Sequence, residues 1–135
     1  MKILPSITPL LVLLLCCFAC NSNANLQQEV ANIEQQIMFT HDEVMPRISK
    51  VLSLRKQVNM RLDSCSNITC KEGLQNISYQ LTKADADMMK WMHQYQKPLV
   101  NDTVIFYLKN QQLMIEQVKV QILNSIIAAD SILKY

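Results

Sequence analysis

The chain has 135 residues, a formal net charge of +2 and 50% hydrophobic residues, which limits it to one domain. A charge so close to zero gives no electrostatic case for binding nucleic acid, which needs a clustered basic surface. The single glycine excludes folds with many tight turns, because such turns require residues that adopt positive φ angles. The composition therefore predicts an all-α fold made of long helices with few connections.

Residues 1–19 have the organisation of an export signal peptide. Lys2 supplies the positive charge, and an unbroken apolar run follows at residues 10–15. This run is too short to cross a hydrocarbon core of about 30 Å comfortably. It leads to an alanine followed by Cys20, which resembles a bacterial lipoprotein box and predicts lipidation of Cys20. Residues 20–25 would then be the lipidated cysteine and a short polar tether.

The predicted lipid gives the mature chain a membrane partner. Acyl chains on Cys20 would hold the amino terminus in a bilayer, because each buried methylene contributes about 0.8 kcal/mol. The tether carries no acidic signal for export to the cell surface. We therefore predict an outer-membrane lipoprotein of the cell envelope that faces the oxidising periplasm. The alternatives are a secreted protein, with a signal cleaved without lipidation, and an uncleaved anchor.

Three helices are predicted, at about residues 26–62, 71–96 and 102–133. In each of them, apolar residues recur at steps of mostly three and four, as expected for one buried stripe. The stripes are Val30, Ile33, Ile37, His41, Val44, Ile48, Val51, Val58 and Leu62; then Leu74, Ile77, Leu81, Ala84, Met88, Trp91 and Tyr95; then Val104, Leu108, Gln111, Ile115, Val118, Ile122, Ser125, Ala129 and Ile132. Short connections make neighbouring helices antiparallel. We predict an elongated up-down-up three-helix bundle with coiled-coil-like packing.

The first helix has one irregular stretch, Thr40 to Pro46. Thr40 and Glu43 have the spacing of a capping box, which would start a new helix after a break near Phe39. Alternatively, Pro46 kinks one continuous helix, because it lacks the N–H group that would bond to residue 42. We predict the continuous, kinked helix.

Cys65 and Cys70 lie in the connection between the first two helices. In an oxidising compartment, two thiols five residues apart most simply form a disulfide that closes the hairpin turn. So short a loop stabilises the fold by at most a few kcal/mol. The spacing differs from that of redox-active pairs, and no further metal ligands lie nearby.

Four side chains form a candidate metal site: His41, Met45, Met89 and His93. Within each helix, the two members lie four residues apart and therefore share a face. If the hairpin turn is centred near residue 67, residue n faces about residue 135 − n, so the two histidines lie at similar heights. Imidazole and thioether ligands would suit Cu(I).

A helical wheel argues against this site. His93 points almost opposite the apolar stripe of its helix, so the two histidines should not converge. The methionines are then flexible core-filling residues, and His41 is a partly buried residue with a hydrogen-bond partner. We expect no cofactor and keep Cu(I) binding as the alternative.

Catalytic chemistry is not indicated. Asp42, Glu43, Asp85 and Asp87 are the candidates for paired carboxylates, but three of them lie off the apolar stripes, where lysines can neutralise them. The chain has neither a nucleophile elbow nor a phosphate-binding loop. We therefore predict that the protein is not an enzyme.

A family resemblance rests on three segments: HDEVMPRISKVLSLRKQV at residues 41–58, ADADMMKWMHQY at 84–95 and FYLKNQQLMIEQV at 106–118. They resemble a family of small lipoproteins of Bacteroidetes and related bacteria. Its members are often labelled "viral A-type inclusion protein", a label that reflects generic coiled-coil similarity. The resemblance covers most of the chain after the leader and implies a cell-envelope lipoprotein without an established activity. The cysteines at 65 and 70 and the atypical lipoprotein box depart from the family.

The two most distinctive stretches are predicted to pack together in the bundle core through Val44, Pro46, Met88, Trp91 and Met92. We predict a structural or protein-binding helical module whose partner protein the sequence does not identify. Homo-oligomerisation is compatible with such a bundle. The alternative is a periplasmic copper-binding protein that uses the histidine and methionine residues.

Overall fold

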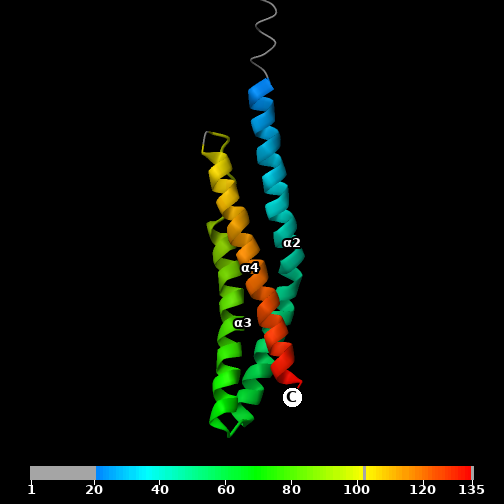
Figure 1. Cartoon of the computed structure of the whole chain (residues 1–135), viewed down its shortest axis with the longest axis vertical. Helices are drawn as coiled ribbons and strands as arrows, with labels where there is room; N and C mark the ends of the chain where they lie inside the picture. Colours follow the sequence, from blue (N-terminus) through cyan, green and yellow to red (C-terminus); the bar gives the residue numbers. More distant parts are fainter. Residues whose placement is uncertain (1–20, 102, 135) are drawn as a thin grey trace, which may run out of the picture.

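The computed structural model describes residues 21–101 and 103–134, which form three α-helices (Figure 1). Helix α2 spans Asn21–Ser64, α3 spans Ile68–Gln94 and α4 spans Val104–Leu133. Helices α2 and α4 run in the same direction and α3 runs opposite to both. The predicted all-α three-helix bundle is confirmed. The predicted signal peptide and Cys20 lie outside the described residues.

The helix boundaries differ from the predicted ones by a few residues. Helix α2 begins at Asn21, before the predicted start near residue 26, so the residues of the predicted polar tether after Cys20 are helical. Helix α3 begins at Ile68 because Asn67 caps it. The Asn67 side-chain oxygen accepts hydrogen bonds from the amides of Thr69 (2.8 Å) and Cys70 (3.4 Å).

Helix α2 passes through Pro46 without interruption, so the continuous helix is confirmed and the alternative of a break is wrong. Its axis changes direction along its length (Figure 1), and a proline in a helix interior is a common cause of such a bend. The Pro46 side chain is exposed, so its predicted place in the packing core is wrong. Two residues after buried Val44, a turn of 100° per residue carries the ring away from the core.

An apolar core runs along the bundle. The predicted stripe of α4 is buried from Val104 to Ala129, including the polar residues Gln111 and Ser125. On α3, Met88 and Trp91 are buried, and Met92 packs against the core half-buried. On α2, Leu54 fills the gap that the predicted stripe left between Val51 and Val58.

One stripe position in α2 was assigned to the wrong residue. Thr40, which is 4% exposed, takes the core position, whereas the His41 side chain is 18% exposed at its edge. The apolar pattern favoured His41 because a step of four from Ile37 and three to Val44 fits a stripe. Steps of three and then four through Thr40 fit equally well, and Thr40 has a polar partner on α4.

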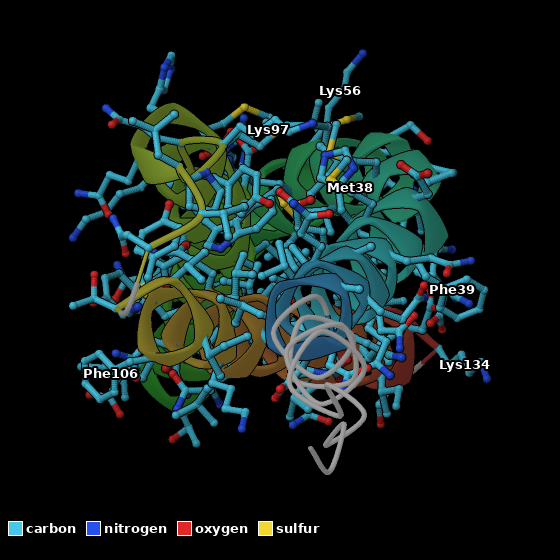
Figure 2. The ribbon with its side chains drawn as sticks, turned by 90° about the horizontal axis from the view of Figure 1, so that it is seen from above. Met38, Phe39, Lys56, Lys97, Phe106 and Lys134 are labelled. Atoms are coloured by element: carbon cyan, nitrogen blue, oxygen red, sulfur yellow. A yellow bond between two sulfur atoms is a disulfide. The ribbon has the colours of Figure 1, made fainter. Side chains whose placement is uncertain are left out.

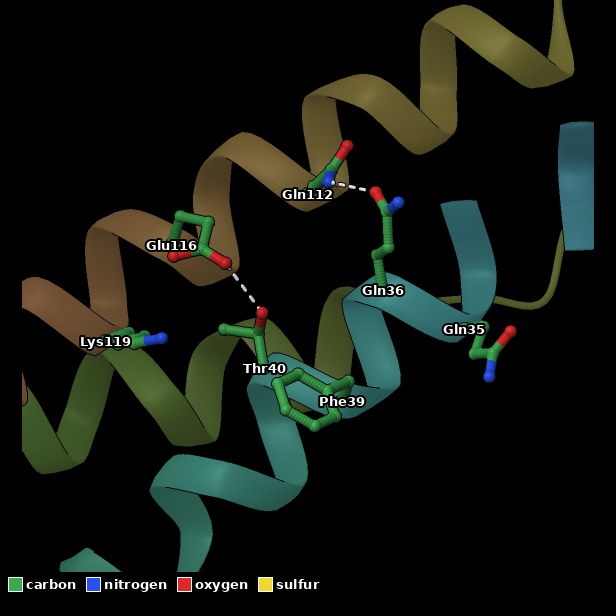
Figure 3. Close-up of a pocket in the computed structure, with 7 residues that line it drawn as sticks. All are labelled: Gln35, Gln36, Phe39, Thr40, Gln112, Glu116 and Lys119. Carbon is green, nitrogen blue, oxygen red and sulfur yellow. Dashed lines mark hydrogen bonds between the residues drawn. The ribbon is translucent and has the colours of Figure 1, made fainter. Parts of the chain in front are cut away.

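Helices α2 and α4 are joined by a row of polar contacts, which we call the α2/α4 polar seam. Figure 3 shows its central part, where Gln112 donates to Gln36 and Thr40 donates to Glu116 across a groove of about 400 Å³. Three of the contacts join residues 76 apart. The seam comprises Glu29–Lys109 (3.7 Å), Gln36–Gln112 (2.7 Å), Thr40–Glu116 (2.6 Å), Glu43–Lys119 (2.6 Å) and Lys50–Asp130 (3.0 Å).

The polar seam fixes how α2 and α4 align. A shift of one turn would separate every partner at once, whereas the apolar stripes tolerate such shifts better. The hydrogen bond to Glu43 raises the pKa of the Lys119 amine, so this lysine stays charged throughout the physiological range.

The turn between α2 and α3 is closed by a disulfide between Cys65 and Cys70, as predicted. Their Cα atoms are 6.5 Å apart, and Cys70 lies in the first turn of α3. The disulfide therefore ties the end of α2 to the start of α3. Within the described residues, no helix is long and apolar enough to cross a membrane.

Replacing Thr40 with valine should lower the free energy of unfolding by about 1–2 kcal/mol. The substitution keeps the volume but removes the donor to the partly buried Glu116, and hydrogen bonds to charged groups contribute about 1.5–3 kcal/mol. Urea unfolding of the full chain measures the change. The matched control is Thr82→Val, which removes an exposed hydroxyl bonded within its own helix and should change stability by less than about 0.5 kcal/mol. Equal changes in the free energy of unfolding for the two substitutions would contradict the proposed contribution of the α2/α4 polar seam to stability.

Candidate functional site

The two distinctive segments of the sequence meet where α2 packs against α3. His41 of α2 places its Nε2 atom 3.4 Å from the Sδ atom of Met92 on α3. The His41 ring also lies 5.8 Å from the Trp91 ring, centroid to centroid, at an interplanar angle of 33°. We call these three residues the His41 cluster.

The position of the turn between α2 and α3 explains why these residues meet. Residue numbers across the α2/α3 contact sum to 133 for His41 and Met92 and to 137 for Asn59 and Ser78. Both sums are close to the predicted 135. His41 and Met92 each follow a core residue of their helix by one position in the sequence. Both therefore lie on the helix edges that face each other.

A carboxylate orients the His41 ring. The Nδ1 atom lies 3.0 Å from Oδ1 of Asp42, and a carboxylate only accepts hydrogen bonds. Nδ1 therefore carries the hydrogen, and in the neutral ring Nε2 is left unprotonated. This nitrogen directs its lone pair toward the Met92 sulfur.

Aromatic rings continue from the cluster to the far end of α3. Trp91 stacks on Tyr95 at 5.1 Å, and Tyr95 stacks on Tyr107 of α4 at 6.5 Å. The Tyr107 hydroxyl donates to the Gln96 carbonyl and accepts from the Gln96 amide, both at 2.9 Å. The Trp91 indole Nε1 is buried without a hydrogen-bond partner in the described part of the chain. The rings thus link all three helices at one end of the bundle.

The predicted metal site is only partly assembled. His41 lies at the α2/α3 contact, and Met45 and Met89 are half-buried against the same core. His93 is exposed and is not part of the group, as the helical wheel indicated. Met92 was predicted to lie in the core only, although it is the residue next to His93. Among the described residues, no three His, Cys, Asp or Glu side chains are placed to hold a metal ion.

The candidate catalytic carboxylates do not come together. Asp87 pairs with Lys83 one turn away, and Asp85 lies 3.7 Å from Arg55 of α2. Asp42 contacts His41, and Glu43 belongs to the polar seam. Each acid therefore has its own partner, an arrangement typical of structural ion pairs.

A second candidate is a surface that the sequence analysis missed, the outward face of α4. Phe106, Leu113, Val120 and Ile127 recur every seven residues there, with 73%, 59%, 54% and 67% of their surfaces exposed. Figure 2 shows Phe106 projecting away from the bundle. We call these four residues the α4 outer stripe. The strict spacing of seven was its signal in the sequence, but the stronger buried stripe of the same helix obscured it.

No protein-family model, curated protein or solved structure matches the chain.

The aromatic stack should leave a signature in the alkaline titration of the chain. Burial, then Glu34 and Tyr107, raise the pKa of Tyr95 above its ordinary value of 10.0. The neutral phenol is favoured in the folded state, so the stabilisation it contributes is complete below pH 10.0 and is lost as pH rises through the folded pKa. Ultraviolet titration should show a late tyrosine step that disappears in Tyr95→Phe and persists in Tyr79→Phe, which alters an exposed ring. A single step for all tyrosines would contradict this assignment.

Proposed function

We propose that this protein is a non-enzymatic lipoprotein of the cell envelope, anchored through Cys20, whose helical bundle associates with a second copy of itself through the α4 outer stripe. The observation that carries this proposal is the composition of the α4 outward face.

The outward face of α4 carries no charge. The helix has four charged residues within Val104–Leu133, and all of them contact α2 through the polar seam: Lys109, Glu116, Lys119 and Asp130. Symmetric pairing of two such faces brings no like charges together. A partner with a charged surface could form no ion pairs with this face. The same face of a second copy is also uncharged and apolar, so the two can pack together.

The polar residues between the stripe members favour a parallel pair. Asn110, Gln117 and Asn124 each lie four residues after a stripe residue and are exposed. Together with the four residues of the α4 outer stripe, they fill both core positions, a and d, of a heptad repeat about 32 Å long. In a parallel pair each amide faces the same amide of the second copy, and an amide can both donate and accept hydrogen bonds. Polar residues at such positions specify register at a cost in stability.

The proposed anchor favours the same orientation. Helix α4 runs parallel to α2, whose first residue follows Cys20 directly. Two copies held in one membrane leaflet would therefore present their α4 helices side by side and in the same direction. The membrane also concentrates the copies, which favours an interface that is weak in dilute solution.

Cysteine cross-linking in isolated envelopes tests the association. Gln117→Cys in the full chain should give a covalent dimer under mild oxidation, because position 117 faces position 117 of the second copy across the two-fold axis. Adding Leu113→Glu should lower the dimer yield at least about tenfold, since two buried carboxylates would then oppose each other. The matched control, Gln75→Cys, places a thiol on an exposed site of α3 and should give no dimer above background. Equal yields at 117 and 75 would contradict the proposed interface.

The anchor is tested separately by replacing Cys20 with serine. The wild-type chain should sediment with membranes and enter the detergent phase, because more than one acyl chain anchors stably. Cys20→Ser should abolish acylation and move the chain out of the detergent phase. Cys65→Ser, which alters a cysteine of the hairpin turn, should leave partitioning unchanged. Absence of an acyl group from the wild-type chain, measured by labelling with a fatty acid, would exclude a lipid at this residue.

A further inference from the structure

We propose that His41 and Met92, together with Met45 and Met89, form a binding site for a soft monovalent cation, Cu(I) or Ag(I), between α2 and α3. This site is separate from the α4 outer stripe, and the inference does not depend on self-association.

The central observation is that two electron-pair donors face each other. Because Asp42 holds the hydrogen of His41 on Nδ1, the neutral ring points a bare nitrogen at the Met92 sulfur, 3.4 Å away. A thioether sulfur is itself only a weak acceptor. In this tautomer the contact has no hydrogen between its two atoms, and a cation that both atoms can bind would stabilise it. Carboxylate orientation of the ring through its second nitrogen is also the usual support of a histidine metal ligand.

The separation of the two atoms indicates how many ligands are needed. With zinc–nitrogen and zinc–thiolate distances of about 2.0 and 2.3 Å as a guide, a nitrogen–sulfur separation of 3.4 Å corresponds to an angle of about 105° at the metal. That angle is far from linear and leaves room for one or two further donors. Met45 follows His41 by one turn, and Met89 precedes Met92 by three residues. Both are half-buried against the same core.

The chemistry of these ligands selects the cation. One imidazole and up to three thioethers form an uncharged, soft set, which favours Cu(I) and Ag(I) over Zn²⁺, Ca²⁺ or Mg²⁺. The His41 side chain is 18% exposed and Trp91 is 3% exposed, so one side of the site is accessible and the other is shielded from water. The Trp91 ring beside His41 also offers a π face to a cation.

Fluorescence provides the direct test, because Trp91 is the only tryptophan of the chain. The full chain in mild detergent is titrated with Cu(I) in ascorbate under anaerobic conditions, and in parallel with Ag(I). Saturable quenching at one equivalent is expected, with a dissociation constant below about 1 µM. His41→Ala and the volume-conserving Met92→Leu should each weaken binding at least about tenfold.

Matched controls separate this site from other ligands. His93→Ala and Met60→Leu remove an exposed histidine and an exposed methionine and should leave affinity unchanged. Cys65→Ser/Cys70→Ser should also retain binding, as should Leu113→Glu in the α4 outer stripe. In NMR spectra of methyl-labelled methionine, Ag(I) should shift the signals of Met45, Met89 and Met92 and leave that of Met60 in place. Absence of saturable quenching, or affinity unaffected by both His41→Ala and Met92→Leu, would overturn the proposal.

Discussion

The α2/α4 polar seam is the constraint on which the other features of this bundle depend. Apolar stripes alone hold helices together but leave their relative heights weakly defined, because similar residues repeat every turn. The five polar pairs remove that freedom, since a shift by one turn would break all of them. They also gather every charge of α4 on the edge that faces α2. The outward face is left uncharged as a direct consequence.

The same seam decides where His41 points. Thr40 occupies the core position because its hydroxyl reaches Glu116 of α4 at 2.6 Å. The next residue is rotated by 100°, which carries His41 to the opposite edge of α2, toward α3. Met92 is displaced from Trp91 in the same way on α3, and the two displaced side chains meet. The position of the His41 cluster therefore follows from the choice of Thr40 as the core residue.

Much of this arrangement could be predicted from the sequence. Periodicity identified the three helices and nearly all of their buried positions, and the hairpin turn placed His41 level with residues 92–94. The helical wheel predicted that His93 points away from the core, and His93 is exposed. The edge of a helix that faces each neighbour could not be predicted, because three stripes are compatible with either handedness of a three-helix bundle. That choice is what pairs His41 with Met92. The α4 outer stripe was missed for another reason: a helix with two apolar faces is assigned by the stronger one.

The His41 cluster occupies the part of the bundle where α3 has the fewest polar ties to α2. Between the turn and Asp85, α3 is held by the disulfide, by Ser78 donating to Asn59 at 2.7 Å, and by Arg55 near Asp85. Toward its other end, the polar contact between the two helices among the described residues is that of His41 with Met92. A ligand that bridges them would act where the bundle is otherwise joined by apolar contact, and binding to the folded state alone stabilises by RT ln(1 + [L]/Kd). Occupancy of this site would thus be coupled to the order of the end of α3, and through the stacked rings of Trp91, Tyr95 and Tyr107 to the start of α4.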